Sequence, residues 1–519
     1  MNFSSIVSIA RRLIQAFGGF HIVVKGPAGH SIMNRLSLPL IGFFIIMLFS
    51  SCQSNYDLST KFPPDQLIHD FRVLRQSLEE AQPGLYRQTS KNELDKAFGE
   101  TEKSLDRPLD VFEFYRILTP LIATIRCGHT NIQLPDFFVK EQDSPRIKSF
   151  PALVKIINGK VYIWRDLSDK NSGLGGKEIL SINKVAAAQI ISTMLAATGG
   201  DGNIQTSRIE RIEGWNFIKR LMPLTGLQPP FELTVSEPNN GRPEQVRLDG
   251  VDIPTLGRNW EAWFPRDRRP SRSGDLEFID DGRIAVMTVR EFGGFVDDQQ
   301  SRGLEEFYQD AFQRMADKNT KTLILDLRDN NGGDDKLGVL LLRRLIGEPF
   351  THYEDIIAKG TYFALGEGIT GTTRIRLPYN AEKRDDGLYH LIDYPNLGIL
   401  QPTSPTLSEE IYVLMNGGSF STTAEVITQL HNHRRAVFIG EEDGGMYDGN
   451  NSGTIALVTL PNTKLVLTVP LMSRRLSVSG DEDNSRGVRP DYPVEYLIDD
   501  YIADSDKEMA VALELARRE

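Results

Sequence analysis

In the first part of the chain, apolar side chains recur with helical spacing. Between positions 67 and 78 the intervals are three and four residues, which places one set on a single helix face: Leu67, Phe71, Leu74 and Leu78. Two more helices are predicted to open at capping-box pairs, Ser90 with Glu93 and Asp110 with Glu113. A glycine turn containing His129 follows, ahead of a strand-like stretch at 131–134. The pattern predicts a small helical domain that ends in a histidine-bearing turn.

The pattern changes to β between about residues 150 and 250. Apolar runs at 153–157 and 160–164 flank Asn158-Gly159, a dipeptide typical of tight hairpin turns. Residues 173–183 resemble the turn and strand of PDZ modules, which bind peptides by adding them to an open sheet edge. The polar stretch 199–214 is unusual in a small PDZ module. Both a peptide-binding role and a purely spacing role fit this pattern.

From about residue 275 onward, apolar strand patterns alternate with amphipathic helix patterns. Strands are predicted at 283–289, 322–327, 411–415 and 436–439. Helices are predicted around 304–315, around 337–345 and from about 422. This alternation favours βαβ units around a largely parallel sheet.

Two of the predicted strand-to-helix turns carry residue types suited to hydroxyl chemistry. The strand 411–415 runs into NGGSFSTTAEV (416–426), and the strand 322–327 runs into DLRDNNGGD (326–334). The first turn of a helix and a glycine-rich backbone both present N–H groups to an anion. A serine nucleophile needs such donors for its tetrahedral intermediate. Taken alone, the first stretch favours a simpler reading, in which Ser419, Ser421 and Thr422 only cap a helix.

Composition excludes other classes of function. The chain has 519 residues, of which 40% are hydrophobic and 25% charged, as in ordinary globular proteins. Its net charge of -11 and the lack of a basic stripe argue against a nucleic-acid partner. Only Cys52 and Cys127 occur, which excludes a disulfide framework and a zinc site of several thiolates. A thiol hydrolase built on Cys127 and His129 is a weaker alternative, because a small buried cysteine is commoner.

The N-terminal segment has the form of an export signal. The apolar run 36–49 follows Arg35 and precedes Ser50-Ser51-Cys52, which resembles the lipobox of bacterial lipoproteins. We therefore expect lipidation at Cys52 and a location in the bacterial cell envelope, lipid-anchored and facing the periplasm. An uncleaved membrane anchor is the alternative. Residues 1–32 are unusual for an export signal, and Met33 would make a more normal start.

The two turns, in this order, resemble the C-terminal-processing (tail-specific) serine peptidase family, including its tricorn-protease-like branch. The matching motifs are Asp326-Leu327-Arg328 through Gly333, Gly418-Ser419-Phe420-Ser421 with Glu425, Gly440-Glu441, and Gly487-Val488-Arg489-Pro490-Asp491. The resemblance implies that Ser421 is the nucleophile, with Ser419 as the alternative. It also implies an oxyanion hole formed by the N–H groups of Thr422 and of Gly332 or Gly333.

The resemblance also bears on the general base. Better-known members use a lysine shortly after Gly-Glu, but residues 440–446 (GEEDGGM) contain none. The tricorn-like branch uses a histidine in a context that Gly128-His129-Thr130 matches, and imidazole suits proton transfer near neutral pH. His431 and His433 are less suitable, because ten helical residues separate His431 from Ser421 by about 15 Å. For the carboxylate that orients His129, the family analogy points to Asp481-Glu482-Asp483, of which we select Asp483, with Glu441 as the rival.

The resemblance implies an α/β fold with a crotonase-like ββα core, an N-terminal helical domain and a PDZ-like β domain. The expected boundaries are 1–52 for the signal segment, 53–140 for the helical domain, 145–250 for the PDZ-like domain, 251–500 for the catalytic core and 501–519 for a C-terminal surface helix. The expected function is hydrolysis of peptide bonds through an acyl-enzyme on Ser421, with His129 as general base and without metal or organic cofactor. A catalytically inactive peptide- or ligand-binding lipoprotein on the same scaffold is the alternative.

Overall fold

The computed structural model describes residues 59–142, 144–168, 173–238, 241–264, 273–293, 298–366, 372–407, 409–480 and 483–518. The chain from Leu58 to Glu519 forms one compact unit. The expected signal segment with Cys52, and the acidic residues Asp481 and Glu482, lie outside the described residues. Within the described part, no helix has both the length and the apolar character needed to cross a membrane.

Three helices form the first part of this unit: α3 (Pro64–Ala81), α4 (Lys91–Lys103) and α5 (Val111–Ala123). The predicted apolar stripe on α3 is fully buried. Both predicted capping boxes are present, since Ser90 and Asp110 each accept the N–H group three residues on, while Glu93 and Glu113 bond back to the cap. The helix predictions for this region are confirmed.

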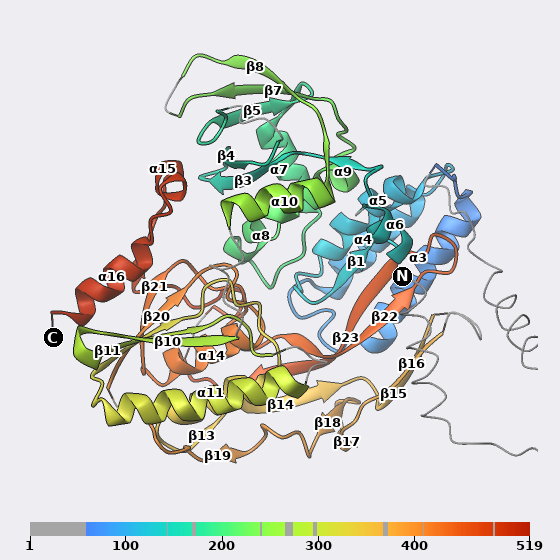
Figure 1. The fold of residues 1–519 in the computed structure, drawn as a ribbon. Coiled ribbons are helices and arrows are strands. Elements are labelled where there is room, and N and C mark those ends of the chain that lie inside the picture. The colour runs from blue at the N-terminus through green and yellow to red at the C-terminus, as the bar shows by residue number, and fades with distance from the viewer. Residues whose placement is uncertain are drawn as a thin grey trace, which may run out of the picture. The chain divides into compact units, whose positions relative to one another are not determined.

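The histidine-bearing turn after α5 is tied to a distant strand. Strand β1 (Asn131–Gln133) pairs antiparallel with β23 (Val466–Leu476), with Asn131 opposite Thr468. Their sheet has the order β1-β23-β14-β18-β17, and β22 (Asn451–Thr459) also pairs with β23 (Figure 1). Its other strands are β14 (Tyr353–Ala358), β18 (Tyr389–Leu391) and β17 (Ala381–Lys383). Through β1, residues near 130 join strands from the C-terminal third of the chain.

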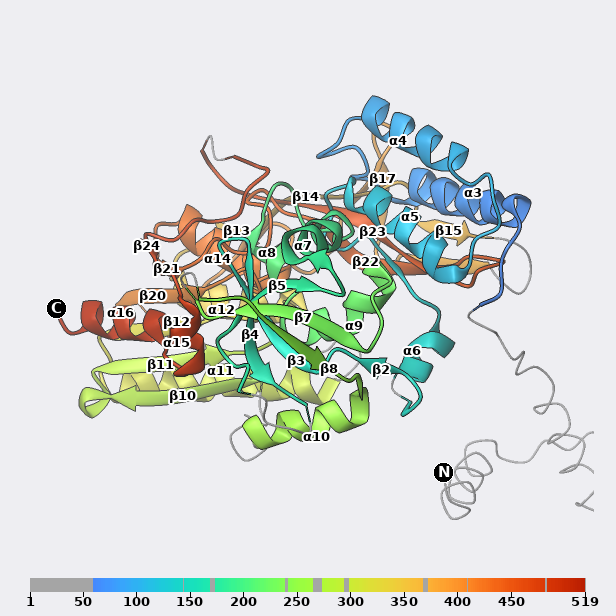
Figure 2. The ribbon, with the colours of Figure 1, turned by 90° about the horizontal axis from the view of Figure 1, so that it is seen from above.

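A separate six-stranded sheet covers the predicted β region, with the order β3-β4-β5-β7-β8 and β6 paired to β5 (Figure 2). Its hairpin is formed by β3 (Ala152–Ile157) and β4 (Lys160–Asp166), and positive φ angles at Asn158 and Gly159 confirm the predicted turn. The remaining strands are β5 (Glu178–Ile182), β6 (Val185–Ala186), β7 (Phe231–Ser236) and β8 (Glu244–Leu248). Between β6 and β7 the chain inserts α7 (Ala187–Ala196), α8 (Thr206–Glu210) and α9 (Gly214–Thr225). The likeness of this sheet to a PDZ module stays a prediction.

The third large sheet contains the two motif-bearing strands. Its order is β10-β11-β12-β20-β21-β24, parallel except where β10 meets β11. The strands are β10 (Gly274–Ile279), β11 (Ile284–Val289), β12 (Thr322–Asp326), β20 (Glu410–Met415), β21 (Val437–Gly440) and β24 (Tyr492–Pro493). The intervening helices are α11 (Asp298–Asp317), α12 (Asp335–Leu345) and α14 (Thr422–Asn432). The predicted parallel βαβ arrangement is confirmed.

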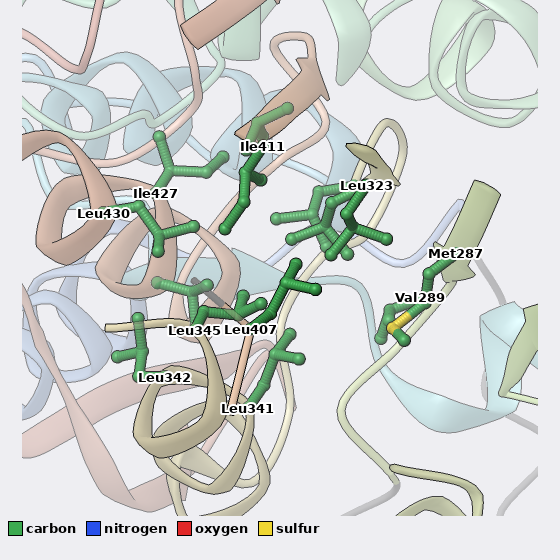
Figure 3. Packing of buried hydrophobic residues seen from close by; sticks show 14 of the residues in the cluster. Met287, Val289, Leu323, Leu341, Leu342, Leu345, Leu407, Ile411, Ile427 and Leu430 are labelled. Carbon is green, nitrogen blue, oxygen red and sulfur yellow. The ribbon is translucent and has the colours of Figure 1, made fainter. Parts of the chain in front are cut away.

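Both faces of this sheet are buried, as expected for parallel strands. Helices α11, α12 and α14 cover one face, where Leu323 and Ile411 meet Leu342 and Ile427 in the main apolar cluster (Figure 3). The opposite face packs against α16 (Lys507–Ala516), which buries Ala512 and Ala516. The expected C-terminal surface helix is present as α16, and its buried side packs on the apolar sheet face beneath it.

The remaining elements are short or peripheral. They are α6 (Asp136–Gln142), β2 (Lys148–Ser149), β9 (Val251–Asp252), α10 (Ile253–Trp263), η2 (Asp280–Gly282), β13 (Phe350–Thr351), β15 (Tyr362–Leu365), β16 (Thr373–Arg376), β19 (Ile399–Leu400) and α15 (Ile498–Ile502).

Candidate active site

Ser421 occupies the turn between β20 and α14 in an unusual backbone conformation. Its φ is 57° and its ψ is -125°, at the N-cap position of α14. A positive φ at a residue other than glycine costs on the order of 1–3 kcal/mol and tends to occur at functional sites. The side chain of Ser421 makes no cap hydrogen bond to the helix. The cap interpretation of Ser421 therefore fails.

The glycine-rich turn after β12 packs directly against Ser421. A Cβ atom on Gly332 would lie 2.7 Å from Ser421 Cβ, so only glycine fits there. The two turns are also linked by a hydrogen bond of 2.9 Å from Thr422 Oγ1 to the carbonyl of Gly333. The strand order explains this proximity, because β12 and β20 are parallel neighbours and their carboxyl ends share one sheet edge.

The backbone N–H groups beside Ser421 differ in whether they already donate a hydrogen bond. The Gly332 N–H donates to Asn330 Oδ1 at 2.9 Å, so its expected role as an oxyanion donor is corrected. Among the hydrogen bonds of the described residues, none engages the N–H of Gly333 or that of Thr422, the first residue of α14. These two groups are the donors that remain for an anion at this edge.

His129, from the turn between α5 and β1, meets Ser421. Its Nε2 lies 3.0 Å from Ser421 Oγ, although 292 positions separate the two residues. The ring stacks on Phe420, with centroids 4.7 Å apart and planes 30° apart. Burial, with the cations Arg211 and Arg474, lowers the pKa of His129 from 6.5 to about 3. The imidazole is therefore neutral near pH 7, with Nε2 placed against the hydroxyl.

The alternative nucleophiles have structural contacts instead. Ser419 is fully buried, and its Oγ donates to the carbonyl of Leu327 at 2.8 Å and accepts from the N–H of Asn416 at 3.1 Å. Cys127 is also buried, and burial raises the pKa of its thiol to about 11. A thiol in that state is a weak nucleophile near neutral pH.

The two histidines at the end of the serine helix point elsewhere. His431 Nδ1 lies 3.0 Å from the hydroxyl of Tyr447, and His433 is paired with Glu348 at 3.5 Å. His431 lies in the last turn of α14, and His433 is the C-cap residue. A cation is favourable at this end of a helix. Their exclusion from the site agrees with the helical-distance argument.

Asp483 and its rival Glu441, the described carboxylates expected to orient His129, do not bond to it. Asp483 is exposed and accepts from the N–H and Oγ of Ser485 at 2.9 and 2.7 Å. Glu441 lines a cavity instead, where burial and the neighbouring Glu213 raise its pKa. His129 Nδ1 is buried and has no hydrogen-bond partner among the described residues. Asp483 is therefore corrected from an orienting group to a local turn cap, a role for which an Asp-x-Ser sequence is well suited.

Sequence reasoning missed Asp201, a carboxylate in the loop between α7 and α8. Its side chain is fully buried, and Oδ1 accepts the N–H of Gly128 at 2.6 Å. A ring nitrogen of His129, a carboxylate oxygen of Asp201 and the sulfur of Cys127 lie within 4.8 Å of one another. By residue type the three groups also suit a soft divalent cation. The available signal was Gly199-Gly200-Asp201-Gly202, a lone acid among glycines in the polar stretch that did not fit a PDZ module.

A buried polar network fixes the helix that carries Ser421. Glu425, one turn along α14, accepts from the hydroxyl of Tyr353 at 2.7 Å and from Asn450 Nδ2 at 2.9 Å. Arg474 lies 3.8 Å from the same carboxylate and 3.4 Å from Asp335. Glu425, Arg474 and Asp335 are all more than nine-tenths buried, so each charge depends on the others. The glutamate of the serine motif is thus an anchor for α14.

A cavity of about 1320 Å³ lies beside the serine turn. Its lining includes Asp329 and Asn416 from the two motif turns, Lys155 and Trp164 from the β3–β4 hairpin, and Tyr501. Ser421 and His129 are not among the described residues that line it. The cavity therefore adjoins the site without containing its reacting atoms.

Comparison with known proteins assigns the region around Ser421. The model of peptidase family S41 matches residues 283–494. This part of the chain is therefore similar to peptidase family S41. The matched region contains both motif turns and Ser421, whereas His129 and Asp201 lie outside it. The match supports a peptidase, a class of enzyme that acts on peptides or proteins.

Solved structures share the fold at low sequence identity. Mature CPAF aligns with a TM-score of 0.59 and 15% identity, covering 88% of this chain and 98% of its own. A mutant of CPAF gives a TM-score of 0.61 with 14% identity over 88% and 98% of the two chains, and mature CPAF complexed with lactacystin gives 0.58 with 15% over 88% and 99%. At these identities the likeness concerns the fold. None of the curated proteins matches this chain in sequence.

Proposed function

We propose that the protein is a serine-type peptidase in which Ser421 is the nucleophile and His129 is the general base. The observation that carries this proposal is the 3.0 Å contact between His129 Nε2 and Ser421 Oγ. This distance is within the range required for proton transfer to a positioned base. The strained backbone of Ser421 supports the same assignment, because strain of this kind concentrates at functional sites.

The proposed reaction is an acyl transfer. His129 Nε2 takes the Ser421 hydroxyl proton while Oγ attacks the carbonyl carbon of a peptide bond. The resulting oxyanion is stabilised by the N–H groups of Gly333 and Thr422, and each such donor is worth about 3 kcal/mol. His129 then gives its proton to the leaving amine, and water resolves the acyl-enzyme by the reverse sequence.

Active-site labelling tests this assignment. A fluorophosphonate probe should label the wild-type protein, and Ser421→Ala should abolish that labelling. Ser419→Ala is the control for the rival hydroxyl and should retain the label on Ser421, at a reduced rate because Ser419 Oγ braces the turn. Labelling that survives in Ser421→Ala would show that another residue is the nucleophile. A wild-type protein that folds, binds peptides and is neither labelled nor active would favour the inactive binding protein.

The location of the protein is a separate proposal, motivated by the lipobox-like residues before Cys52. We place the peptidase in the bacterial cell envelope, anchored by lipid on Cys52 and facing the periplasm. An alkyne-tagged fatty acid should be incorporated by the wild-type chain and not by Cys52→Ser. Equal incorporation by the two chains would overturn the lipid anchor and leave the peptidase assignment untouched.

A further inference from the structure

Two buried polar atoms next to the proposed catalytic pair have no partners. His129 Nδ1 and Asp201 Oδ2 are both inaccessible and unbonded among the described residues. They belong to side chains whose ring nitrogen and carboxylate oxygen lie within 4.8 Å. Leaving a buried polar atom without a hydrogen bond costs on the order of 1–3 kcal/mol. A donor and an acceptor that both lack partners are therefore stabilised when they bond to each other. Nδ1 can donate, and a carboxylate oxygen can only accept.

The loop that carries Asp201 is fastened to the turn that carries His129. Gly128 donates its N–H to Asp201 Oδ1 at 2.6 Å, and Gly202 donates its N–H to the carbonyl of Arg126 at 3.1 Å. Arg211 bridges the two segments through Nη1, at 3.0 Å from the carbonyl of Gly128 and 3.5 Å from that of Gly199. The same guanidinium lies over the Phe420 ring on which His129 stacks. Asp201 is therefore held at a fixed place relative to the imidazole.

We propose that Asp201 is the positioning residue of His129, with Oδ2 accepting the Nδ1–H hydrogen bond when substrate occupies the site. This inference rests on the proposed function of Ser421 and His129. It replaces Asp483, whose carboxylate accepts from Ser485, and Glu441, which lines the neighbouring cavity. The two oxygens of Asp201 have separate tasks: Oδ1 fixes the backbone at Gly128, and Oδ2 orients the ring.

The hydrogen bond selects the tautomer that the reaction needs. Nε2 must present a lone pair to the Ser421 hydroxyl, so the single proton of the neutral ring must sit on Nδ1. When Nε2 takes up the serine proton, the ring becomes an imidazolium, and the ionised Asp201 stabilises that charge without being protonated itself. This opposes the neighbouring cations Arg211 and Arg474, which disfavour the imidazolium.

The charged groups around Asp201 allow it to play this role. Burial raises the pKa of its carboxyl, while the Gly128 N–H, Arg211 and Arg87 lower it and Asp448 raises it. The other titratable group at the imidazole is the Cys127 thiol, which burial keeps protonated. The pKa of the Asp201 carboxyl is raised overall, chiefly by burial, and of the trio it is the group that supplies negative charge to the ring when it is ionised.

Asp201→Asn separates the two tasks of the side chain. An asparagine keeps one oxygen for the Gly128 N–H, but its NH₂ group cannot accept from Nδ1. We expect kcat to fall by about 10²- to 10⁴-fold with KM changed by less than about threefold, and the acidic limb of the pH profile to move to lower pH. In protein labelled with ¹⁵N-histidine, the His129 signals should shift from the Nδ1–H tautomer toward the Nε2–H tautomer.

Asn203→Ala is the matched control, because Asn203 lies in the same loop and bonds to Arg126 and Ser485 without carrying a charge. It should keep kcat, the pH profile and the tautomer of the wild-type protein. Wild-type kcat and an unmoved pH profile in Asp201→Asn would overturn the positioning role, even if Ser421→Ala is inactive. Activity that persists in Ser421→Ala would instead overturn the proposed function.

Discussion

At the scale of single residues, the site depends on conformations that the sequence does not display. Ser421 could be selected from its place between a strand and a helix, yet its φ of 57° became visible only in the folded chain. The φ and ψ angles of Ser421 are close to the mirror image of an extended conformation. Glycine adopts such positive φ angles about as readily as negative ones. The strain at Ser421 therefore has a direct test, a comparison of two substitutions that both remove the hydroxyl and its contact with His129.

Replacing Ser421 by glycine and by alanine should give inactive proteins of different stability. Ser421→Gly relieves a strain of about 1–3 kcal/mol and loses up to about 1 kcal/mol through the added freedom of the unfolded chain. We expect it to be about 1 kcal/mol more stable than Ser421→Ala, as measured by urea denaturation. Equal stabilities, or a more stable alanine variant, would show that the turn is not strained.

The lowered pKa of His129 makes both the folding stability and the activity of the protein depend on pH. Between pH 6.5 and about 3 the unfolded chain takes up a proton on this histidine that the folded protein does not, so stability falls as pH falls through that window. In His129→Gln this loss should be smaller between pH 7 and pH 4, as measured by thermal unfolding. The acidic limb of kcat/KM in the wild-type protein should lie below pH 6.5. A limb at or above pH 6.5 would contradict the neutral, desolvated imidazole.

Local motifs predicted some site residues and misassigned others, for a physical reason. Ser421 and His129 lie in short segments, 416–426 and 128–130, whose residue types themselves indicate a catalytic turn. The family analogy selects Asp483, but the N–H and hydroxyl of Ser485, two residues further on, donate to its carboxylate. Asp201 carries no local sign beyond its flanking glycines, because its importance comes from packing against residues more than 70 positions away.

At the scale of elements, helices and strands could be predicted because their signals are local. Apolar spacing and capping boxes located α3, α4 and α5, and apolar runs located β12 and β20. The pairing of β1 with β23 could not be predicted, since Asn131 and Thr468 are far apart in the sequence and three residues give little pattern. Yet this pairing is what carries the His129 turn to the serine.

Weakening β1 should separate His129 from Ser421 without touching either. Ile132, in β1, is buried and pairs with Leu467, whereas its neighbour Gln133 is exposed. Ile132→Ala should cost about 2–4 kcal/mol in urea denaturation and slow fluorophosphonate labelling. Gln133→Ala, on the same strand, should change stability by less than about 0.5 kcal/mol and leave labelling unchanged. Equal labelling rates in the two variants would show that β1 does not position the histidine.

At the scale of the whole molecule, one proposed site draws on three parts of the chain. The helical part contributes His129, the loop after α7 contributes Asp201, and the sheet matched by the family S41 model contributes Ser421. The family match supports a peptidase and the likeness to solved structures concerns the fold, but neither the matched range nor the sequence order places the three side chains together. That placement follows from β1 on β23 and from the hydrogen bonds of Asp201 and Gly202 with the His129 turn.

The central claim is that His129 activates Ser421, although 292 positions separate them in the sequence. Peptide mapping by mass spectrometry after fluorophosphonate treatment tests this claim most directly. The account predicts a single adduct on the peptide that contains Ser421, formed at least about 100-fold more slowly in His129→Ala than in the wild-type protein. An adduct on a different residue, or an undiminished rate in His129→Ala, would contradict it.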